Sequence, residues 1–318
     1  AQLLSHLQEQ LQKRGITLPY LERYAEAPQR GQAFLNPVGL APALLWEYNE
    51  KVIWALPGVP VELQAFWVEV VQPYLQEHFG LATPLEITLR TTGLTESSLS
   101  ARIETWEAEK PTALRLAYNP SWEGVSLHLS APPTFPLAEF TNWIEKLRQL
   151  IGPYIYAEGP TTLTAALIAA LKQQGLTIST AESCTGGHIA AALVDVPGAS
   201  DVLRGSVVAY HNDIKKELLS VPAVTLETEG AVSEPTARAM VRGIRTLTRS
   251  SIGIATTGIA GPTGGTPTKP VGLVYIAIET PDRTFVKPYH FPGGREVVIA
   301  RATATALSLT WQILTQLI

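Results

Sequence analysis

Cysteine is nearly absent from this sequence. Cys184 is the only one among 318 residues, so no intrachain disulfide can form. Such a composition is typical of a reducing compartment, and we expect a cytoplasmic protein. Methionine is equally scarce, because Met240 is its only occurrence and the chain starts at Ala1 within an apolar helical run. We therefore expect a fragment or a processed product, and no signal peptide is evident.

An excess of positive charge and long apolar runs are also missing. Lys and Arg total 24 against 28 Asp and Glu, a net charge of −4, and no basic stripe with interleaved aromatics occurs. This disfavours nucleic-acid binding. The longest apolar runs, such as residues 163–171, fall short of the roughly 18 residues that a membrane span needs. The six histidines are scattered, with no close pair and no cysteine cluster, so we expect no metal site.

The most informative segment is residues 180–187, which combine a hydroxyl, a thiol, a carboxylate and two glycines. It follows an expected strand at residues 176–181 and precedes an apolar helical run at residues 189–194, so it should join a strand to a helix. The amides freed by Gly186 and Gly187 would point out of the first helical turn toward an anion or an oxyanion. Taken alone, this pattern fits acyl transfer, phosphate binding or a packing turn.

Two later segments bring further polar groups to the end of the expected sheet. A β-branched strand at residues 206–210 ends in Tyr210, and a helix capped by Asn212 then carries Lys215. A glycine- and proline-rich loop at residues 256–272 joins two apolar strands. Loops at the end of a sheet are where open α/β folds bind ligands, so these segments extend the candidate site.

Six segments of the second half occur in one order. They are Thr180-Ala181-Glu182-Ser183-Cys184-Thr185-Gly186-Gly187, Pro197-Gly198-Ala199-Ser200, Tyr210 with Lys215, Gly230-Ala231-Val232-Ser233, Thr257-Gly258-Ile259-Ala260-Gly261-Pro262 and Gly293-Gly294-Arg295-Glu296. Together they resemble the carboxy-terminal domain of CinA proteins, over about half of the chain. The resemblance implies a nicotinamide-nucleotide amidase, which hydrolyses nicotinamide mononucleotide to nicotinic acid mononucleotide and ammonia in pyridine nucleotide salvage. It implies no metal or redox cofactor, and we expect a homo-oligomer.

This resemblance assigns catalytic roles to three side chains. Hydrolysis of an unactivated amide needs a nucleophile, a base and donors for the oxyanion. Ser183 is the implied nucleophile and Lys215 the implied base, whose pKa must fall from its usual value of about 10.4. Tyr210 is expected to relay a proton or to hold the amine. The amides of the turn from Cys184 to Gly187 are expected to receive the oxyanion.

Substrate-binding roles are expected for a wider set of residues. Some of these residues also have a purely structural interpretation. Glu182 could satisfy local amides, and Ser200 and Thr257 could cap a helix or a loop. Arg295 could form a surface salt bridge rather than bind a phosphate. The set comprises Glu182, Cys184, Thr185, Gly186, Gly187, Ser200, Thr257, Gly258 and Arg295.

A cysteine amidase is the sharpest rival mechanism. Cys184 adjoins the expected nucleophile, and a thiolate is intrinsically more nucleophilic than a hydroxyl. Its base would be His188 or His211. We favour Ser183, because the family resemblance places the nucleophile there and because a lone cysteine is often a small packing residue.

The first half has a different character. Residues 36–42 and 56–63 look like the later part of the molybdopterin-binding-like domain that precedes the amidase domain in CinA proteins. The early Gly-Gly-Leu-Gly-Pro-Thr motif of that domain is absent, and its Gly-Thr-Ala-Pro-Gly segment is here Gly39-Leu40-Ala41-Pro42-Ala43. Both departures argue against an ADP-ribose pyrophosphatase activity, which remains an alternative function. We expect a structural remnant that leaves a sheet edge or an apolar face exposed.

We therefore expect an α/β protein of three parts. Residues 1–80 form a partial molybdopterin-binding-like α/β domain, and residues 81–157 form a small α+β connecting domain. Residues 158–318 form a three-layer α/β amidase domain with a mixed sheet, joined by a linker at residues 153–160. A non-catalytic scaffold associated with competence is the remaining alternative.

Overall fold

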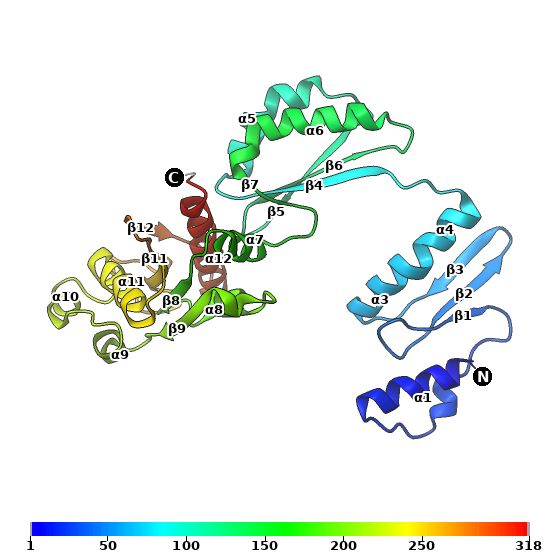
Figure 1. The fold of residues 1–318 in the computed structure, drawn as a ribbon, viewed down its shortest axis with the longest axis horizontal. Coiled ribbons are helices and arrows are strands. Elements are labelled where there is room, and N and C mark those ends of the chain that lie inside the picture. Colours follow the sequence, from blue (N-terminus) through cyan, green and yellow to red (C-terminus); the bar gives the residue numbers. More distant parts are fainter. Residues whose placement is uncertain (1, 317–318) are drawn as a thin grey trace. The chain divides into compact units, whose positions relative to one another are not determined.

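The computed structural model describes residues 2–316. The chain divides into two compact units between Thr83 and Pro84, and their elements are labelled along the chain in Figure 1. The described residues form three separate sheets, one in the first unit and two in the second.

The first unit contains a small antiparallel sheet in the order β1-β2-β3. Several of its large apolar side chains are exposed, including Ile53, Val61, Trp67 and Val68. Its elements are α1 (Gln2–Arg14), α2 (Leu21–Tyr24), β1 (Gln32–Phe34), β2 (Ala43–Tyr48), β3 (Lys51–Ala55), α3 (Pro60–Phe66), the π-helical turn η1 (Trp67–Val71) and α4 (Gln72–Phe79).

The second unit begins with an antiparallel sheet in the order β5-β6-β4-β7. Two helices pack against it, and burial along β6 alternates with period two, so one face of the sheet meets the helices. Its elements are β4 (Leu85–Thr91), α5 (Glu96–Glu109), β5 (Arg115–Pro120), β6 (Val125–Ala131), α6 (Leu137–Ile151) and β7 (Ile155–Glu158).

The expected linker at residues 153–160 is in large part not a linker. A 3₁₀ turn, η2 (Gly152–Tyr154), leads directly into β7, which pairs with β4 at the edge of this sheet. Glycine and proline punctuate both sides of the segment, but only four residues between them join the sheet. A strand this short carries too little periodicity to be recognised from sequence.

A mixed five-stranded sheet forms the rest of the second unit. Its order is β12-β11-β10-β8-β9, with β8 parallel to both of its neighbours and β11 antiparallel to both of its own. The strands are β8 (Ile178–Glu182), β9 (Leu203–Val208), β10 (Ile252–Gly258), β11 (Leu273–Glu279) and β12 (Thr284–His290).

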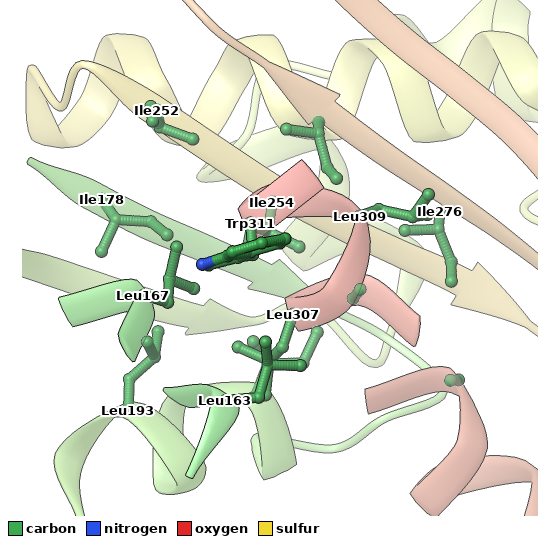
Figure 2. Packing of buried hydrophobic residues seen from close by; sticks show 14 of the residues in the cluster. Leu163, Leu167, Ile178, Leu193, Ile252, Ile254, Ile276, Leu307, Leu309 and Trp311 are labelled. Carbon is green, nitrogen blue, oxygen red and sulfur yellow. The ribbon is translucent and has the colours of Figure 1, made fainter. Parts of the chain in front are cut away.

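Helices cover both faces of this sheet, which confirms the expected three-layer α/β architecture. One face carries α7 (Leu163–Gln173), α8 (His188–Val194) and α12 (Arg295–Leu314). The other carries α11 (Glu234–Thr248), preceded by α9 (Asn212–Glu217) and α10 (Ala223–Thr228). Figure 2 shows Leu307, Leu309 and Trp311 among isoleucines of the strands in the first core. Burying side chains of this size stabilises the layer by about 2 kcal/mol each.

Helix α12 is the one described helix that is long and apolar enough to cross a membrane. Most of its residues are buried, and its side chains form part of the core shared with α7, α8 and the sheet. Its apolar composition is therefore accounted for by its central place in the protein core.

Two local boundaries near the site differ from the sequence prediction. The strand expected at residues 206–210 is β9, which ends at Val208, where its pairing with Glu182 of β8 ends. The cap of α9 is His211 rather than Asn212, because His211 Nδ1 accepts the amide of Asp213 at 3.2 Å. Tyr210 thus lies beyond the sheet.

Candidate active site at the carboxyl end of the central strands

Ser183 lies immediately beyond the carboxyl end of β8. Its amide donates to the carbonyl of Thr256 on β10 at 2.9 Å, so the sheet pairing continues one residue past the strand. On the other side, the amide of Ala209 donates to the carbonyl of Glu182 at 2.7 Å. Backbone bonds on both flanks therefore fix the position from which the Ser183 side chain projects.

The amine of Lys215 reaches this hydroxyl from α9. Lys215 is 1% exposed, and its Nζ lies 3.1 Å from Ser183 Oγ. The same nitrogen donates to the carbonyls of Ala209 at 2.7 Å and of Tyr210 at 3.4 Å. Burial lowers the pKa of the Lys215 amine, because desolvation disfavours its charged form.

The three contacts of Nζ define what its neutral form would do. A neutral amine has two hydrogens and one lone pair, and the two carbonyls can only accept. When both hydrogens are directed at Ala209 and Tyr210, the lone pair is left for the Ser183 hydroxyl proton. This arrangement is that of a base in contact with its nucleophile.

Glu182 is completely buried and supports the turn. Its carboxylate accepts the amides of Gly187, Ile189 and Ala190 at 3.0, 3.1 and 2.8 Å, which lie at the start of α8. The hydroxyl of Thr185 donates to the same carboxylate at 2.7 Å. A negative charge at a helix amino terminus is favourable, so Glu182 caps α8. Of its two expected roles, the structure shows the satisfaction of local amides.

A cavity of about 360 Å³ opens beside the Ser183–Lys215 pair. Its walls come from Ser183 and Cys184, from Tyr210, Asn212 and Lys215, from residues 231–232, from the segment at residues 257–264 and from Arg295. The volume lies in the range of small-molecule sites. Segments separated by more than a hundred residues thus enclose one space.

Comparison with known proteins identifies the family. A family model described as the CinA C-terminal domain matches residues 160–314. A competence-damage inducible protein of Desulforudis audaxviator is 40% identical over 302 residues, which are 93% of this chain and 72% of that protein. The chain belongs to the CinA family.

The chain spans different shares of the length of other family members. A CinA-like protein of Amoebophilus asiaticus is 40% identical over 76% of this chain and 59% of its own length. The crystal structure of the competence/damage inducible protein CihA from Agrobacterium tumefaciens is 40% identical. It covers 48% of this chain and 93% of its own, with a TM-score of 0.47. The chain is thus shorter than both named CinA-family relatives whose sequences it matches.

Tyr210 contributes to this CinA-family site differently from the prediction. Its backbone carbonyl, and not its phenol, contacts the Lys215 amine. The phenol oxygen accepts from Arg295 Nη2 at 2.8 Å, and Arg295 Nη1 donates to the carbonyl of Gly261 at 3.0 Å. The phenol therefore positions the arginine at the cavity wall, and the geometry gives no support to a proton relay through it.

Four further residues of the turn were expected to bind the substrate, but they do not all line the cavity. They are Cys184, Thr185, Gly186 and Gly187. Only Cys184 lines the cavity, whereas the Thr185 hydroxyl is engaged by Glu182 and Thr256. The amide of Gly186 donates to Ser183 O at 3.2 Å and that of Gly187 to Glu182. The expectation that these two glycine amides receive an oxyanion is therefore wrong, because both are already used within the turn.

Both glycines are nonetheless required by the turn. Their φ angles of 60° and 97° lie in the left-handed region that other residues rarely adopt. Thr257 and Gly258 do line the cavity, but Thr257 Oγ1 donates to the carbonyl of Ala231 at 2.6 Å and so also holds a neighbouring wall. A Cβ on Gly258 would lie 2.6 Å from Leu273 O, so strand packing alone demands glycine there.

Ser200 lies at the wrong end of the sheet for a role in this site. It belongs to the exposed 3₁₀ turn η3 (Ala199–Asp201), which precedes β9. Because β9 is parallel to β8, a residue before β9 and a residue after β8 occupy opposite edges. The expected substrate-binding role of Ser200 is therefore wrong.

The surroundings of Cys184 argue against the rival mechanism. The side chain is buried, and burial raises the pKa of its thiol to about 12, so very little thiolate exists near neutral pH. His188 Nδ1 contacts Thr185 O at 2.6 Å, and His211 contacts Asp213. Neither histidine is among the residues of the cavity wall.

Sequence reasoning missed the carbonyl of Ala209 and the wall formed by Ala231 and Val232. The carbonyl makes the shortest contact to Lys215, yet an alanine gives no chemical signal in a sequence. The alanine–valine pair stands out in the sequence only as part of the family-like segment Gly230-Ala231-Val232-Ser233. Asn212, which was considered only as a cap, is a further wall residue.

Proposed function

We propose that this CinA-family protein is an amidohydrolase in which Ser183 is the nucleophile and Lys215 the base. One observation carries the proposal, the 3.1 Å contact between Nζ of a completely buried lysine and Oγ of Ser183. A lysine held by two carbonyls and a hydroxyl, without a carboxylate bonded to its nitrogen, is suited to proton abstraction once its pKa is lowered.

The reaction would run in two halves. Neutral Lys215 takes the proton of Ser183 Oγ as that oxygen bonds to the carboxamide carbon, and the carbonyl oxygen becomes an oxyanion. The donors that we assign to it are the amides of Cys184 and Thr185, the two residues that directly follow Ser183 in the turn. Protonated Lys215 then returns its proton to the leaving nitrogen, and ammonia departs. Water, deprotonated by Lys215, cleaves the acyl ester and restores Ser183.

We infer that the substrate is nicotinamide mononucleotide, which gives nicotinic acid mononucleotide and ammonia. The support for this choice is the resemblance of the motifs to CinA proteins together with the cationic wall of the cavity. Arg295 is held by Gly261 O and Tyr210 Oη, and it presents a guanidinium to a space that also contains the Ser183 hydroxyl. A planar guanidinium binds phosphate through paired hydrogen bonds.

We further infer a cytoplasmic homo-oligomer without a nucleic-acid or membrane partner. A single cysteine supports the compartment, and a net charge of −4 without a basic stripe supports the lack of a nucleic-acid partner, whereas the homo-oligomer is a proposal without compositional support. The pyrophosphatase and scaffold alternatives are not favoured by any contact in the described residues.

The test is release of ammonia from nicotinamide mononucleotide by the full chain in buffer that contains a chelator. Ser183→Ala should reduce kcat at least about 10³-fold, whereas Cys184→Ala should keep it within about tenfold. Full activity of Ser183→Ala with an inactive Cys184→Ala would establish the thiol mechanism instead. No turnover by the wild type would leave the scaffold alternative, and cleavage of ADP-ribose would favour the pyrophosphatase.

A further inference from the structure

A second and larger cavity lies within the second compact unit, about 660 Å³ in volume. One side is formed by the start of α5 and by the turn between β5 and β6, and the other by β12 and α12. It shares no wall residue with the Ser183 cavity. Its chemistry is therefore independent of the amide-hydrolysing site.

Aromatic rings line this second cavity. Alternate residues of β12 face it, namely Phe285, Lys287 and Tyr289, as expected for one face of a strand. The rings of Tyr289 and Phe291 are parallel, with centroids 5.7 Å apart. Opposite them, Trp122 in the β5–β6 turn is 58% exposed. A large indole in contact with solvent at a cavity offers a stacking surface for a planar ring.

Two cations accompany these rings. The Arg301 guanidinium carbon lies 5.6 Å from the centroid of Trp122 and 5.5 Å from that of Phe291, and Lys287 Nζ lies 5.5 Å from the Tyr289 centroid. Throughout residues 2–316, neither cation forms an ion pair or donates a hydrogen bond to the protein. The flat faces of the guanidinium meet aromatic rings, so its N–H edges remain available for an anion.

Two carboxylates also border the cavity, those of Glu96 and Glu123. Glu123 Oε2 is engaged by Tyr156 Oη at 3.1 Å and by the amide of Leu163 at 3.3 Å, so it is fixed in the wall. Glu96 lies in the first turn of α5. A carboxylate in a nucleotide site commonly accepts from ribose hydroxyls.

Stacking rings, free cations and a carboxylate within one cavity match the three parts of a nucleotide. We propose that this cavity binds a mononucleotide, with its base on Trp122, its phosphate on Arg301 and Lys287, and its ribose toward Glu96. The site would serve binding rather than chemistry, and it stands whether or not the amidase proposal holds.

The experiment is equilibrium dialysis of radiolabelled adenosine monophosphate against the full chain. Adenosine and inorganic phosphate are the competitors, because they carry the ring and the anion separately. We expect Arg301→Gln and Trp122→Ala each to weaken binding about tenfold or more, since loss of a stacking ring or of a charge partner has effects of this size. Trp122 is exposed, so its variant should fold even if Arg301→Gln does not.

Two arginine variants provide the controls. Arg242→Gln removes an exposed arginine of α11 that is remote from this cavity, and it should leave the affinity unchanged. Arg295→Gln alters the Ser183 cavity, and it therefore identifies any nucleotide that binds there rather than in the second cavity. The proposal would be overturned by binding that survives both Arg301→Gln and Trp122→Ala, by binding lost in Arg295→Gln but kept in Arg301→Gln, or by no binding at millimolar nucleotide. The proposal would also be overturned if adenosine alone, or phosphate alone, displaced the radiolabelled nucleotide as strongly as unlabelled adenosine monophosphate does.

Discussion

The loop around Asn36 in the first unit and the turn around Ser183 in the second both bury polar side chains, but they differ in what remains available. Asn36 is 1% exposed. Its amide nitrogen donates to Ala41 O at 2.8 Å and to Glu62 Oε2 at 2.9 Å, and its oxygen accepts the amides of Val38 and Gly39. All four hydrogen-bonding positions of the side chain are thus used internally.

At the Ser183 turn, one buried polar pair borders a cavity. Glu182 is bonded on both of its carboxylate oxygens, just as Asn36 is bonded on both its amide oxygen and its amide nitrogen, and Glu182 stabilises the start of α8. Ser183 and Lys215, in contrast, contact each other and face a cavity. Buried polar groups with every position filled indicate a structural role, whereas a buried pair beside free space indicates chemistry. The comparison therefore separates a loop organiser from a candidate active site.

Replacement of Lys215 should produce the largest effect. Lys215→Met keeps the length of the side chain and removes the base, so kcat should fall about 10³-fold. Thermal stability should stay level or rise, because a buried amine is exchanged for an apolar group. Ammonia release and a melting curve on the same sample measure both. Activity within tenfold of the wild type would show that Lys215 is not the base.

The pH dependence of turnover should follow the Lys215 amine. Its neutral form is the reactive one, so kcat/KM should rise with pH, by up to tenfold per unit, and level off above the pKa of Lys215. Burial lowers that pKa, and the midpoint should therefore lie below about 10.4. A profile of kcat/KM between about pH 6 and pH 11 checks this expectation. An activity that falls steadily with rising pH would be incompatible with a lysine base.

Glu182→Gln should affect stability before chemistry. The amide nitrogen of glutamine would face backbone donors at the start of α8, so at least one buried amide loses its acceptor. We expect the free energy of unfolding to fall by about 3 kcal/mol and Tm by about 8 °C, measured by thermal denaturation. An unchanged Tm together with a large loss of kcat would instead place Glu182 on the substrate.

Asn36→Ala should give the smallest effect on activity. It removes four hydrogen bonds from the first unit, so the free energy of unfolding of that unit should fall by about 2 kcal/mol. Ammonia release should remain within about twofold. Tryptophan fluorescence in urea reports the first change, because Trp46, Trp54 and Trp67 lie in this unit. A tenfold loss of amidase activity would contradict a purely structural role of the Asn36 loop.

The sequence by itself determined the local elements around the site. Apolar periodicity located α7, β8 and α8 within two residues of their observed ends, and the glycine pair marked the turn between them. Ser183 directly follows this strand, and its proposed role as the nucleophile came from the resemblance of its segment to CinA proteins. These features depend on neighbours a few residues apart, which is the range over which propensity and periodicity act.

Only the tertiary structure decided which groups meet. Ser183 follows β8 and Ser200 precedes β9, and the parallel pairing of these strands places the two serines at opposite edges of the sheet. The glycine amides looked free in the sequence and are taken by Glu182 and Ser183 O. Lys215 lies 32 residues from Ser183, and only packing brings its amine against two carbonyls and the Ser183 hydroxyl, as the proposed role of a base requires. The sequence therefore specifies which residues could form the site, whereas their burial and the saturation of their hydrogen bonds are properties of the folded chain.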